Sequence, residues 1–297
     1  MRVLLTGESG FVGGYFRQVI PCIPFVDKKG LPVDLRDSIA VGKSIREIKP
    51  NIVVHLAGQS SVPNSFINPM LTYYVNFIGT LNLLGALKES GFKGCMLYVG
   101  SGEVYGLVDP VRMPIIEECP LKPRNPYAVS KLAAESLCYQ WSQTESFKIV
   151  LVRPFNHIGP GQSERFVVSD FTKQVVEIKR GMRLPKIFVG DIDVTRDFTD
   201  VRDVVRAYTL LLEYGVNGEV YNVCSGKEQS VRSILEMLIE LSGVTADVVQ
   251  DQSKLRKSEQ RRMVASYDKL HRTTGWRPAL SLEQTLKDVL TRWEMLI

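Results

Sequence analysis

The 297-residue sequence is poor in metal-binding side chains, because it has three histidines and five cysteines that form no CxxC pair. Metal centres need clustered ligands of these types, so the sequence predicts no metal site. An odd number of scattered cysteines also gives no disulfide framework. Reduced thiols are typical of cytoplasmic proteins, and we expect that location here.

Long apolar runs are also missing, and no stretch reads as the roughly 18 consecutive apolar residues of a membrane span. The opening residues MRVLLTGESG read as a strand and a glycine-rich turn rather than as a signal peptide. The formal net charge is +5, and its densest basic cluster, 254–262, is interrupted by Glu259. We therefore expect neither a membrane partner nor a nucleic-acid partner.

Apolar runs alternate along the chain with helical patterns. The expected strands cover 2–6, 52–58, 95–101, 148–156, 187–189 and 219–224, and the expected helices cover 10–20, 69–90, 126–144, 167–181, 201–214, 230–243 and 281–296. Continuous apolar strands indicate a parallel sheet that is covered on both faces. We predict an α/β fold: a Rossmann-type doubly wound sheet (1–156 plus 200–224) with a smaller substrate-binding lobe (157–199 plus 225–297).

Three glycines in TGESGFVG follow the first strand and open the first helix. In a dinucleotide site, Gly7 allows the tight turn, Gly10 lets a pyrophosphate approach the backbone, and Gly13 permits close helix packing. The free N–H groups of the helix start would face the phosphates. This context predicts binding of NADPH or NADH.

The residues that would hold the cofactor ribose do not settle the choice between the two cofactors. Asp27 ends a short apolar stretch and favours NAD, whereas Lys28 and Lys29 favour the 2′-phosphate of NADP. A surface loop with scattered charges is the alternative for the two lysines. Asp34 and Leu35 are expected to border the adenine.

The helix 126–144 carries Tyr127 and Lys131 four residues apart, and therefore on one face. A cation one turn away, together with an oxidised nicotinamide, would lower the phenol pKa from its usual value near 10. Ser101, at the end of a neighbouring strand, would polarise a substrate carbonyl. The set predicts hydride transfer, in which Tyr127 exchanges the proton and Lys131 orients the cofactor.

The motifs TGESGFVG, HLAGQSSV, SGEVYG, NPYAVSKLAAE and RPFNHIGPGQ resemble the extended short-chain dehydrogenase/reductases that act on nucleotide sugars. Within this family the chain is similar to the GDP-6-deoxy-D-mannose reductases. The resemblance implies reduction of the C4 keto group of a GDP-4-keto-6-deoxy-D-mannose by NAD(P)H. It implies cofactor contacts from Gly7, Gly10, Phe11, Val12, Gly13, Asp34, Leu35, Leu56, Ala57, Gly58, Asn76, Tyr127, Lys131, Pro154 and His157. It implies substrate contacts from Ser101, Glu103, Tyr127, Asn156, Val167, Lys173, Arg196, Arg256 and Glu259.

Glu103 leaves a second reaction open. Sugar-nucleotide 4,6-dehydratases carry a glutamate at this position as the base that removes the C5 proton, and some carry an acid where this chain has Gly102. We expect Glu103 to be a pocket residue, with a 4,6-dehydratase or 4-epimerase as the alternative activity. A catalytically silent, cofactor-sensing protein is the alternative from another class, and an intact Ser101, Tyr127 and Lys131 speaks against it. Related enzymes pair through two long helices, so we expect a homodimer through 69–90 and 126–144.

Overall fold

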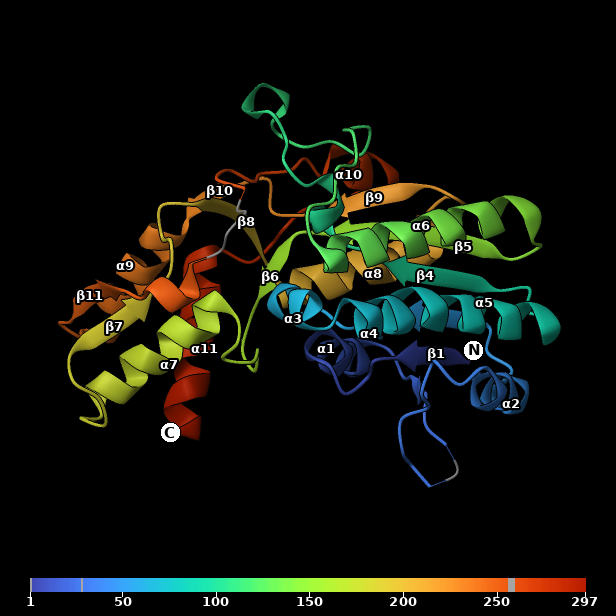
Figure 1. The fold of residues 1–297 in the computed structure, drawn as a ribbon, viewed down its shortest axis with the longest axis horizontal. Helices are drawn as coiled ribbons and strands as arrows, with labels where there is room; N and C mark the ends of the chain where they lie inside the picture. The colour runs from blue at the N-terminus through green and yellow to red at the C-terminus, as the bar shows by residue number, and fades with distance from the viewer. Residues whose placement is uncertain (1, 28, 256–259) are drawn as a thin grey trace.

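A parallel six-stranded sheet forms the larger lobe in this computed structural model, which describes residues 2–27, 29–255 and 260–297 (Figure 1). The strand order is β2-β1-β3-β4-β5-β9. The strands are β1 (Val3–Thr6), β2 (Ile23–Pro24), β3 (Ile52–His55), β4 (Cys95–Val99), β5 (Lys148–Pro154) and β9 (Val220–Val223). The order reverses between β1 and β3, and ligands of such sheets bind at the carboxyl ends of the strands beside that reversal. The predicted fold class is confirmed.

Helices cover both faces of the sheet, as continuous apolar strands require. One face packs against α2 (Ser38–Ile48), α5 (Gly79–Glu89) and α6 (Pro126–Thr144) through a fully buried core. The other face packs against α1 (Phe11–Val19), α8 (Val201–Tyr214) and α10 (Asp268–Thr274). Short turns complete the lobe: α3 (Val62–Ile67), η2 (Gly102–Tyr105) and η3 (Pro110–Arg112).

The expected helix 69–90 is one continuous helical segment with an irregular middle. It consists of α4 (Pro69–Tyr73), a π-helical turn η1 (Tyr74–Ile78) and α5. By length and composition, Pro69–Glu89 is apolar enough to cross a membrane, although the sequence analysis predicted no membrane span. In the structure the segment packs against α6 and α2, as a core helix does. The expected absence of a membrane partner stays a prediction.

The smaller lobe lies beyond the carboxyl edge of the large sheet (Figure 1). It contains a three-stranded sheet of β10 (Glu228–Ser230), β8 (Thr195–Asp200) and β6 (Asn156–Ile158), and a two-stranded sheet of β11 (Asp247–Gln250) and β7 (Lys186–Val189). Its helices are α7 (Val167–Lys179), α9 (Val231–Ser242) and α11 (Leu282–Leu296), with the turn η4 (Gln252–Lys254). Phe171, Ile234 and Leu286 belong to its separate core.

The predicted boundary between the lobes needs one correction. We assigned 225–297 to the smaller lobe, but Leu270 of α10 and Trp276 are buried in the same core as Tyr208 of α8. The Trp276 indole also donates a 3.0 Å hydrogen bond to the Asp203 carbonyl. These large apolar side chains return the α10 region to the larger lobe.

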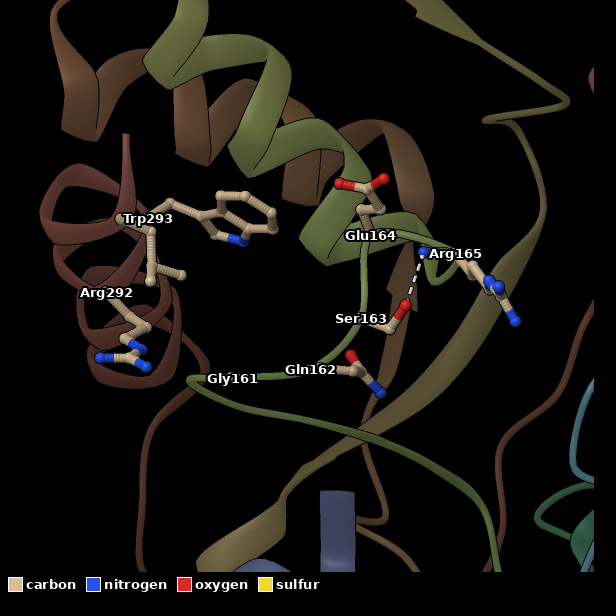
Figure 2. Close-up of a pocket in the computed structure, with 8 residues that line it drawn as sticks. Gly161, Gln162, Ser163, Glu164, Arg165, Arg292 and Trp293 are labelled. Atoms are coloured by element: carbon tan, nitrogen blue, oxygen red, sulfur yellow. Dashed lines mark hydrogen bonds between the residues drawn. The ribbon is translucent and has the colours of Figure 1, made fainter. Parts of the chain in front are cut away.

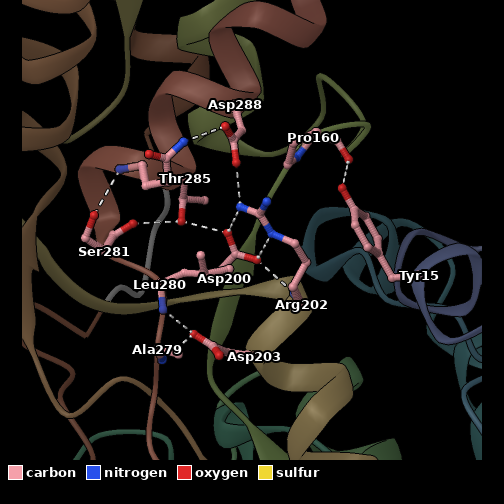
Figure 3. A network of polar contacts seen from close by, with 11 residues as sticks. Tyr15, Pro160, Asp200, Arg202, Asp203, Ala279, Leu280, Ser281, Thr285 and Asp288 are labelled. Carbon is pink, nitrogen blue, oxygen red and sulfur yellow. Dashed lines mark hydrogen bonds and ion pairs between the residues drawn. The ribbon is translucent and has the colours of Figure 1, made fainter. Parts of the chain in front are cut away.

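An ion network joins the two lobes (Figure 3). Asp200 caps α8, and its carboxylate pairs with Arg202 at 2.7 Å and accepts a 2.7 Å hydrogen bond from Thr285 of α11. Arg202 also pairs with Asp288 of α11 at 2.7 Å. Because α8 packs on the large sheet and α11 on the smaller core, these contacts fix one lobe against the other.

Candidate active site

The glycine-rich turn after β1 is closed by tight backbone contacts. Gly7 has φ +77°, and a Cβ there would lie 2.7 Å from the Ala57 nitrogen. A Cβ on Gly13 would lie 2.3 Å from the Gly7 carbonyl, so Gly13 is needed for packing within the turn itself. A Cβ on Gly10 would meet only the Gly7 carbonyl, at 3.2 Å. Gly7 and Gly13 are therefore required for the close packing of the turn. Gly10 leaves the surface of the turn without a side chain.

Gly10 is the N-cap residue before α1 and supplies no side-chain cap, whereas α2, α6, α8, α9 and α11 each have one. Phe11 and Val12 are its first residues. Uncapped N–H groups at a helix start attract anions, particularly phosphates. The geometry fits the predicted pyrophosphate site.

Gly58, Asn76 and Lys131 meet at the carboxyl end of β3. A Cβ on Gly58 would lie 3.0 Å from Asn76 Oδ1 and 3.5 Å from Lys131 Nζ. Asn76 lies in the π-helical turn η1, and its amide donates to the Gln59 carbonyl and to Ser130 Oγ of α6, at 3.0 and 2.9 Å. π-helical turns often accompany functional sites. The structure thus brings these three predicted cofactor residues together.

Tyr127 and Ser101 form the reactive pair. Both are buried, and the Ser101 hydroxyl lies near enough to the Tyr127 phenol to lower its pKa. Ser101 also caps η2, since its Oγ accepts a 3.2 Å hydrogen bond from the Glu103 nitrogen. Asn125 begins α6 by accepting from the Ala128 nitrogen at 2.7 Å, which fixes Tyr127 in the first turn. The predicted proton donor and carbonyl-binding hydroxyl lie close together.

The expected lowering of the Tyr127 pKa does not come from the protein's own groups. The pKa of Tyr127 is raised to about 12, mainly by burial; the neighbouring Ser101 hydroxyl lowers it, and the Glu103 carboxylate raises it. Lys131 Nζ donates to the Val99 carbonyl at 2.8 Å. Burial lowers the pKa of Lys131 to about 8. Lys131 is thus a buried ammonium beside the cofactor residues, charged at neutral pH, and its lowered pKa brings its loss of charge to about pH 8.

Glu103 and Gly102 line the same turn in different ways. Glu103 accepts a 3.1 Å hydrogen bond from the Asn125 side-chain amide. A Cβ on Gly102 would lie 3.1 Å from three atoms of the buried Phe155 ring. The Phe155 ring stacks against Tyr105, with 6.1 Å between the centroids. A side chain at position 102 would therefore require the Phe155 ring to shift by a few tenths of an ångström.

Pro154, Asn156 and His157 continue from β5 into the smaller lobe. Pro154 ends β5, and Asn156 and His157 lie in β6 beside β8. The His157 ring lies parallel to the Phe11 ring, with 6.2 Å between their centroids, and burial lowers the pKa of His157. These contacts place the predicted cofactor residue His157 beside the start of α1. Next to it in β8, the buried Thr199 hydroxyl has no hydrogen-bond partner among the described residues.

At the ribose end, the structure gives Asp27 a role within its own turn. The Asp27 carboxylate accepts hydrogen bonds from the Lys29 and Leu31 nitrogens, at 2.8 and 3.0 Å, so it closes a hairpin turn. Lys28 lies outside the described residues. Leu35 packs against Gly79 of α5, and the exposed Asp34 and Arg36 pair at 2.6 Å. Asp27 thus stabilises a turn. The cationic group beside Asp34 is Arg36, which the sequence analysis did not identify as a candidate.

The predicted substrate residues of the smaller lobe do not all gather at one place. Arg196 of β8 donates to the carbonyls of Thr195 and Gln260, at 2.8 and 2.7 Å. Val167 is the exposed first residue of α7. Lys173 pairs with Glu164 at 2.6 Å and lies over the Trp293 ring, so its contacts lie toward α11 rather than toward Asn156. Arg256 and Glu259 lie outside the described residues.

A cavity of about 410 Å³ lies on the α11 side of the smaller lobe (Figure 2). Its lining comes from the loop 161–165 and from the end of α11, including Arg165, Arg292 and Trp293. Neither Ser101 nor Tyr127 lines it. The cavity is therefore separate from the reactive pair.

The fold and the site are those of a nucleotide-sugar enzyme with a dinucleotide-binding sheet, and comparison with known sequences supports this class. A model of the family "GDP-mannose 4,6 dehydratase" matches residues 28–289. The chain belongs to this family of nucleotide-sugar enzymes. The match supports the resemblance that the motifs predicted.

Individual proteins of known name resemble the chain to different degrees. The chain is 47% identical over 296 residues to the GDP-6-deoxy-D-mannose reductase of Pseudomonas aeruginosa, covering 99% of this chain and 97% of that protein. It is 33% identical to the GDP-mannose 4,6-dehydratase of Vibrio cholerae, but only over 71% of this chain and 56% of that protein. Among solved structures, RMD from Pseudomonas aeruginosa complexed with NADPH superposes with a TM-score of 0.93 at 45% identity, covering 100% of both chains.

Two contacts at the site were not predicted from the sequence. Asn125 holds both the start of α6 and the Glu103 carboxylate, and Phe155 covers Gly102. The signal for Asn125 was present, because Asn followed by Pro at the first helical position is a helix-start pattern. The signal for Phe155 was not, because its partner is 53 positions earlier and is a glycine.

Proposed function

We propose that the protein reduces the C4 keto group of GDP-4-keto-6-deoxy-D-mannose to GDP-6-deoxy-D-mannose (GDP-D-rhamnose), with NADPH as the reductant. The placement of Ser101 near Tyr127, with Lys131 and Asn76 beside Gly58, carries the proposal. The relative of 47% identity that bears the name of this reductase supports the substrate. The NADPH complex of a structure of 45% identity supports the cofactor.

The residues of this chain divide the reaction between them. When bound, NADPH supplies the hydride. Ser101 hydrogen-bonds the C4 carbonyl oxygen and polarises it, while Tyr127 gives its phenolic proton to that oxygen as the alkoxide forms. A phenol whose pKa is about 12 remains protonated at neutral pH, as a proton donor must. Lys131 and Asn76 would hold the ribose side of the cofactor at the end of β3.

The dehydratase alternative is less well supported by the same turn. A dehydratase would need Glu103 as a base, and some members add an acid at the neighbouring position. Here the Phe155 ring lies against the space into which a side chain at Gly102 would extend. Glu103 is also engaged with Asn125. We infer that Glu103 orients the sugar in this enzyme.

A homodimer and a cytoplasmic location are part of the proposal. Ile67, Met70 and Tyr74 are exposed apolar side chains near the start of the long helical segment, and Tyr139 is exposed on α6. The five cysteines are free thiols, which suits a reducing compartment. Light scattering on the eluting protein would test the dimer, and an Ile67→Glu/Met70→Glu variant should elute as a monomer.

Absorbance at 340 nm tests the reaction directly. We expect stoichiometric loss of NADPH absorbance with GDP-4-keto-6-deoxy-D-mannose and none with GDP-mannose. Conversion of GDP-mannose to a keto product without net loss of NADPH would instead establish a dehydratase. Parallel assays with NADH give the cofactor preference.

A further inference from the structure

Gln260 connects the two lobes at the edge of the active site. Its side-chain amide makes two hydrogen bonds to one residue of the larger lobe: Val108 donates its N–H to Oε1 at 3.0 Å, and Nε2 donates to the Val108 carbonyl at 3.2 Å. Its own carbonyl accepts the 2.7 Å hydrogen bond from Arg196 of β8. A single residue thus touches Arg196 and the chain that follows the catalytic turn.

Val108 is a firm anchor point. It is buried in a core with Tyr105 and Phe155, the ring that covers Gly102. Between Tyr105 and Val108, Gly106 has φ +60°, and a Cβ there would lie 1.7 Å from the Lys122 carbonyl oxygen, so no side chain fits. The segment from Ser101 to Val108 is therefore held by buried side chains at Val104, Tyr105 and Val108.

The chain around Gln260 is attached to both lobes as well. Arg261 accepts a 2.8 Å backbone hydrogen bond from Thr195 of β8 in the smaller lobe. Farther along, Val264 accepts from Ile115 at 2.9 Å, on the excursion 106–118 of the larger lobe. Of these described contacts, the Gln260 amide is the side-chain link nearest to the reactive turn.

We propose that Gln260 is a positioning residue that sets the distance between Arg196 and the Ser101–Tyr127 pair. The inference rests on the proposed function, in which Arg196 holds the diphosphate and the pair reacts at C4 of the sugar. Two ends of one substrate are then held by different lobes, and their separation must match the length of that substrate. A bidentate amide defines the separation without adding a charge near the diphosphate.

The kinetic consequence is specific to the chemical step. Gln260→Ala keeps the backbone carbonyl that holds Arg196 but removes the link to Val108. We expect kcat to fall roughly tenfold or more, because small displacements of a reacting group slow the reaction strongly. The affinities for GDP and for NADPH should stay within about twofold of wild type.

The experiment compares full-length Gln260→Ala and Gln260→Glu with Gln252→Ala, an exposed glutamine in η4. Gln260→Glu retains the acceptor for Val108 N–H but turns a carboxylate oxygen toward its carbonyl, so its defect should be at least as large. With NADPH deuterated at the transferred position, the primary isotope effect on kcat should rise in both Gln260 variants. Melting temperatures show whether each variant is folded.

The outcomes separate the two proposals. If the wild type does not consume NADPH with the keto sugar, the proposed function fails and this inference falls with it. If the wild type is active and Gln260→Ala matches Gln252→Ala in kcat and isotope effect, only the inference is overturned. A lower melting temperature with equal losses in GDP and NADPH affinity would also overturn it, because that pattern marks a merely structural role.

Discussion

The two lobes hold their functional side chains in opposite ways. In the larger lobe Ser101, Tyr127 and Lys131 are each no more than 8% exposed, and each is tied to neighbours within the lobe. In the smaller lobe Val167 is 37% exposed, and Lys173 is held in a surface ion pair with Glu164. Groups that react are buried and fixed, whereas groups that would bind the nucleotide lie near the surface.

This difference follows from the two tasks. Proton and hydride transfer need fixed geometry, so the reacting groups stand on the ends of buried strands and on the first turn of α6. Binding a GDP-sugar needs charge and access, and a half-buried cation such as Lys173 can exchange its ion pair for one with the arriving ligand. The comparison predicts that changes to the reacting groups of the larger lobe affect kcat and that changes to the nucleotide-binding groups of the smaller lobe affect the KM for the GDP-sugar.

Replacing the reactive phenol should have the largest effect. Tyr127→Phe removes the proton donor while keeping the ring, and general acid catalysis contributes about 10² to 10⁴ in rate. We expect kcat to fall about 10³-fold with an unchanged NADPH affinity, measured by absorbance and by titration of protein fluorescence. Tyr139→Phe, an exposed tyrosine on the same helix, serves as the matched control. Near-normal turnover in Tyr127→Phe would remove this residue from the reaction.

In the smaller lobe, Arg196→Ala is the corresponding change. A hydrogen bond to a charged group is worth about 1.5–3 kcal/mol, which corresponds to roughly tenfold to a hundredfold in affinity. We expect the KM for the GDP-sugar to rise by that factor while kcat changes little. Arg232→Ala, which breaks an exposed pair with Asp193, is the control and should leave both constants unchanged. A fall in kcat with constant KM would contradict the division between the lobes.

The same comparison explains what the sequence could predict. The strands and helices of the larger lobe could be predicted because its strands are continuous apolar runs and its turn glycines stand at fixed spacing. The bounds of α6 and α8 agree with the expected 126–144 and 201–214. The expected strands 52–58, 95–101 and 148–156 end earlier, at His55, Val99 and Pro154, because the residues that follow leave the sheet to form the site.

What escaped prediction depends on distant contacts or on weak local patterns. Helix α2 was missed because SIAVGKSIREI mixes β-branched residues with Gly42, and its cap, Asp37, stood in a charged stretch. The role of Asp27 depends on its hairpin partners. The links of Phe155 to Gly102 and of Gln260 to Val108 join residues far apart in the chain, which no single-sequence pattern reports.

A smaller effect is expected from the titration of Lys131. Burial lowers the pKa of its ammonium to about 8, so it is charged below that pH and neutral above it. If the charge helps to hold the cofactor ribose, the KM for NADPH should rise several-fold between pH 7 and pH 9. Lys131→Met should show the high KM at both pH values. A wild-type KM that does not change across this range would show that Lys131 acts without its charge.

The smallest effect should come from Glu103→Gln, although Glu103 lies beside the reactive pair. The amide keeps an oxygen that accepts from Asn125, and it removes the negative charge that raises the pKa of Tyr127. A reductase should therefore keep its kcat within about threefold, as should the exposed control Glu118→Gln. A dehydratase would lose its base, and its rate would fall by about 10² or more. Because residue 102 is a glycine, no carboxylate at that position would compensate for the loss. The size of this one effect therefore separates the two reactions even where their substrates overlap.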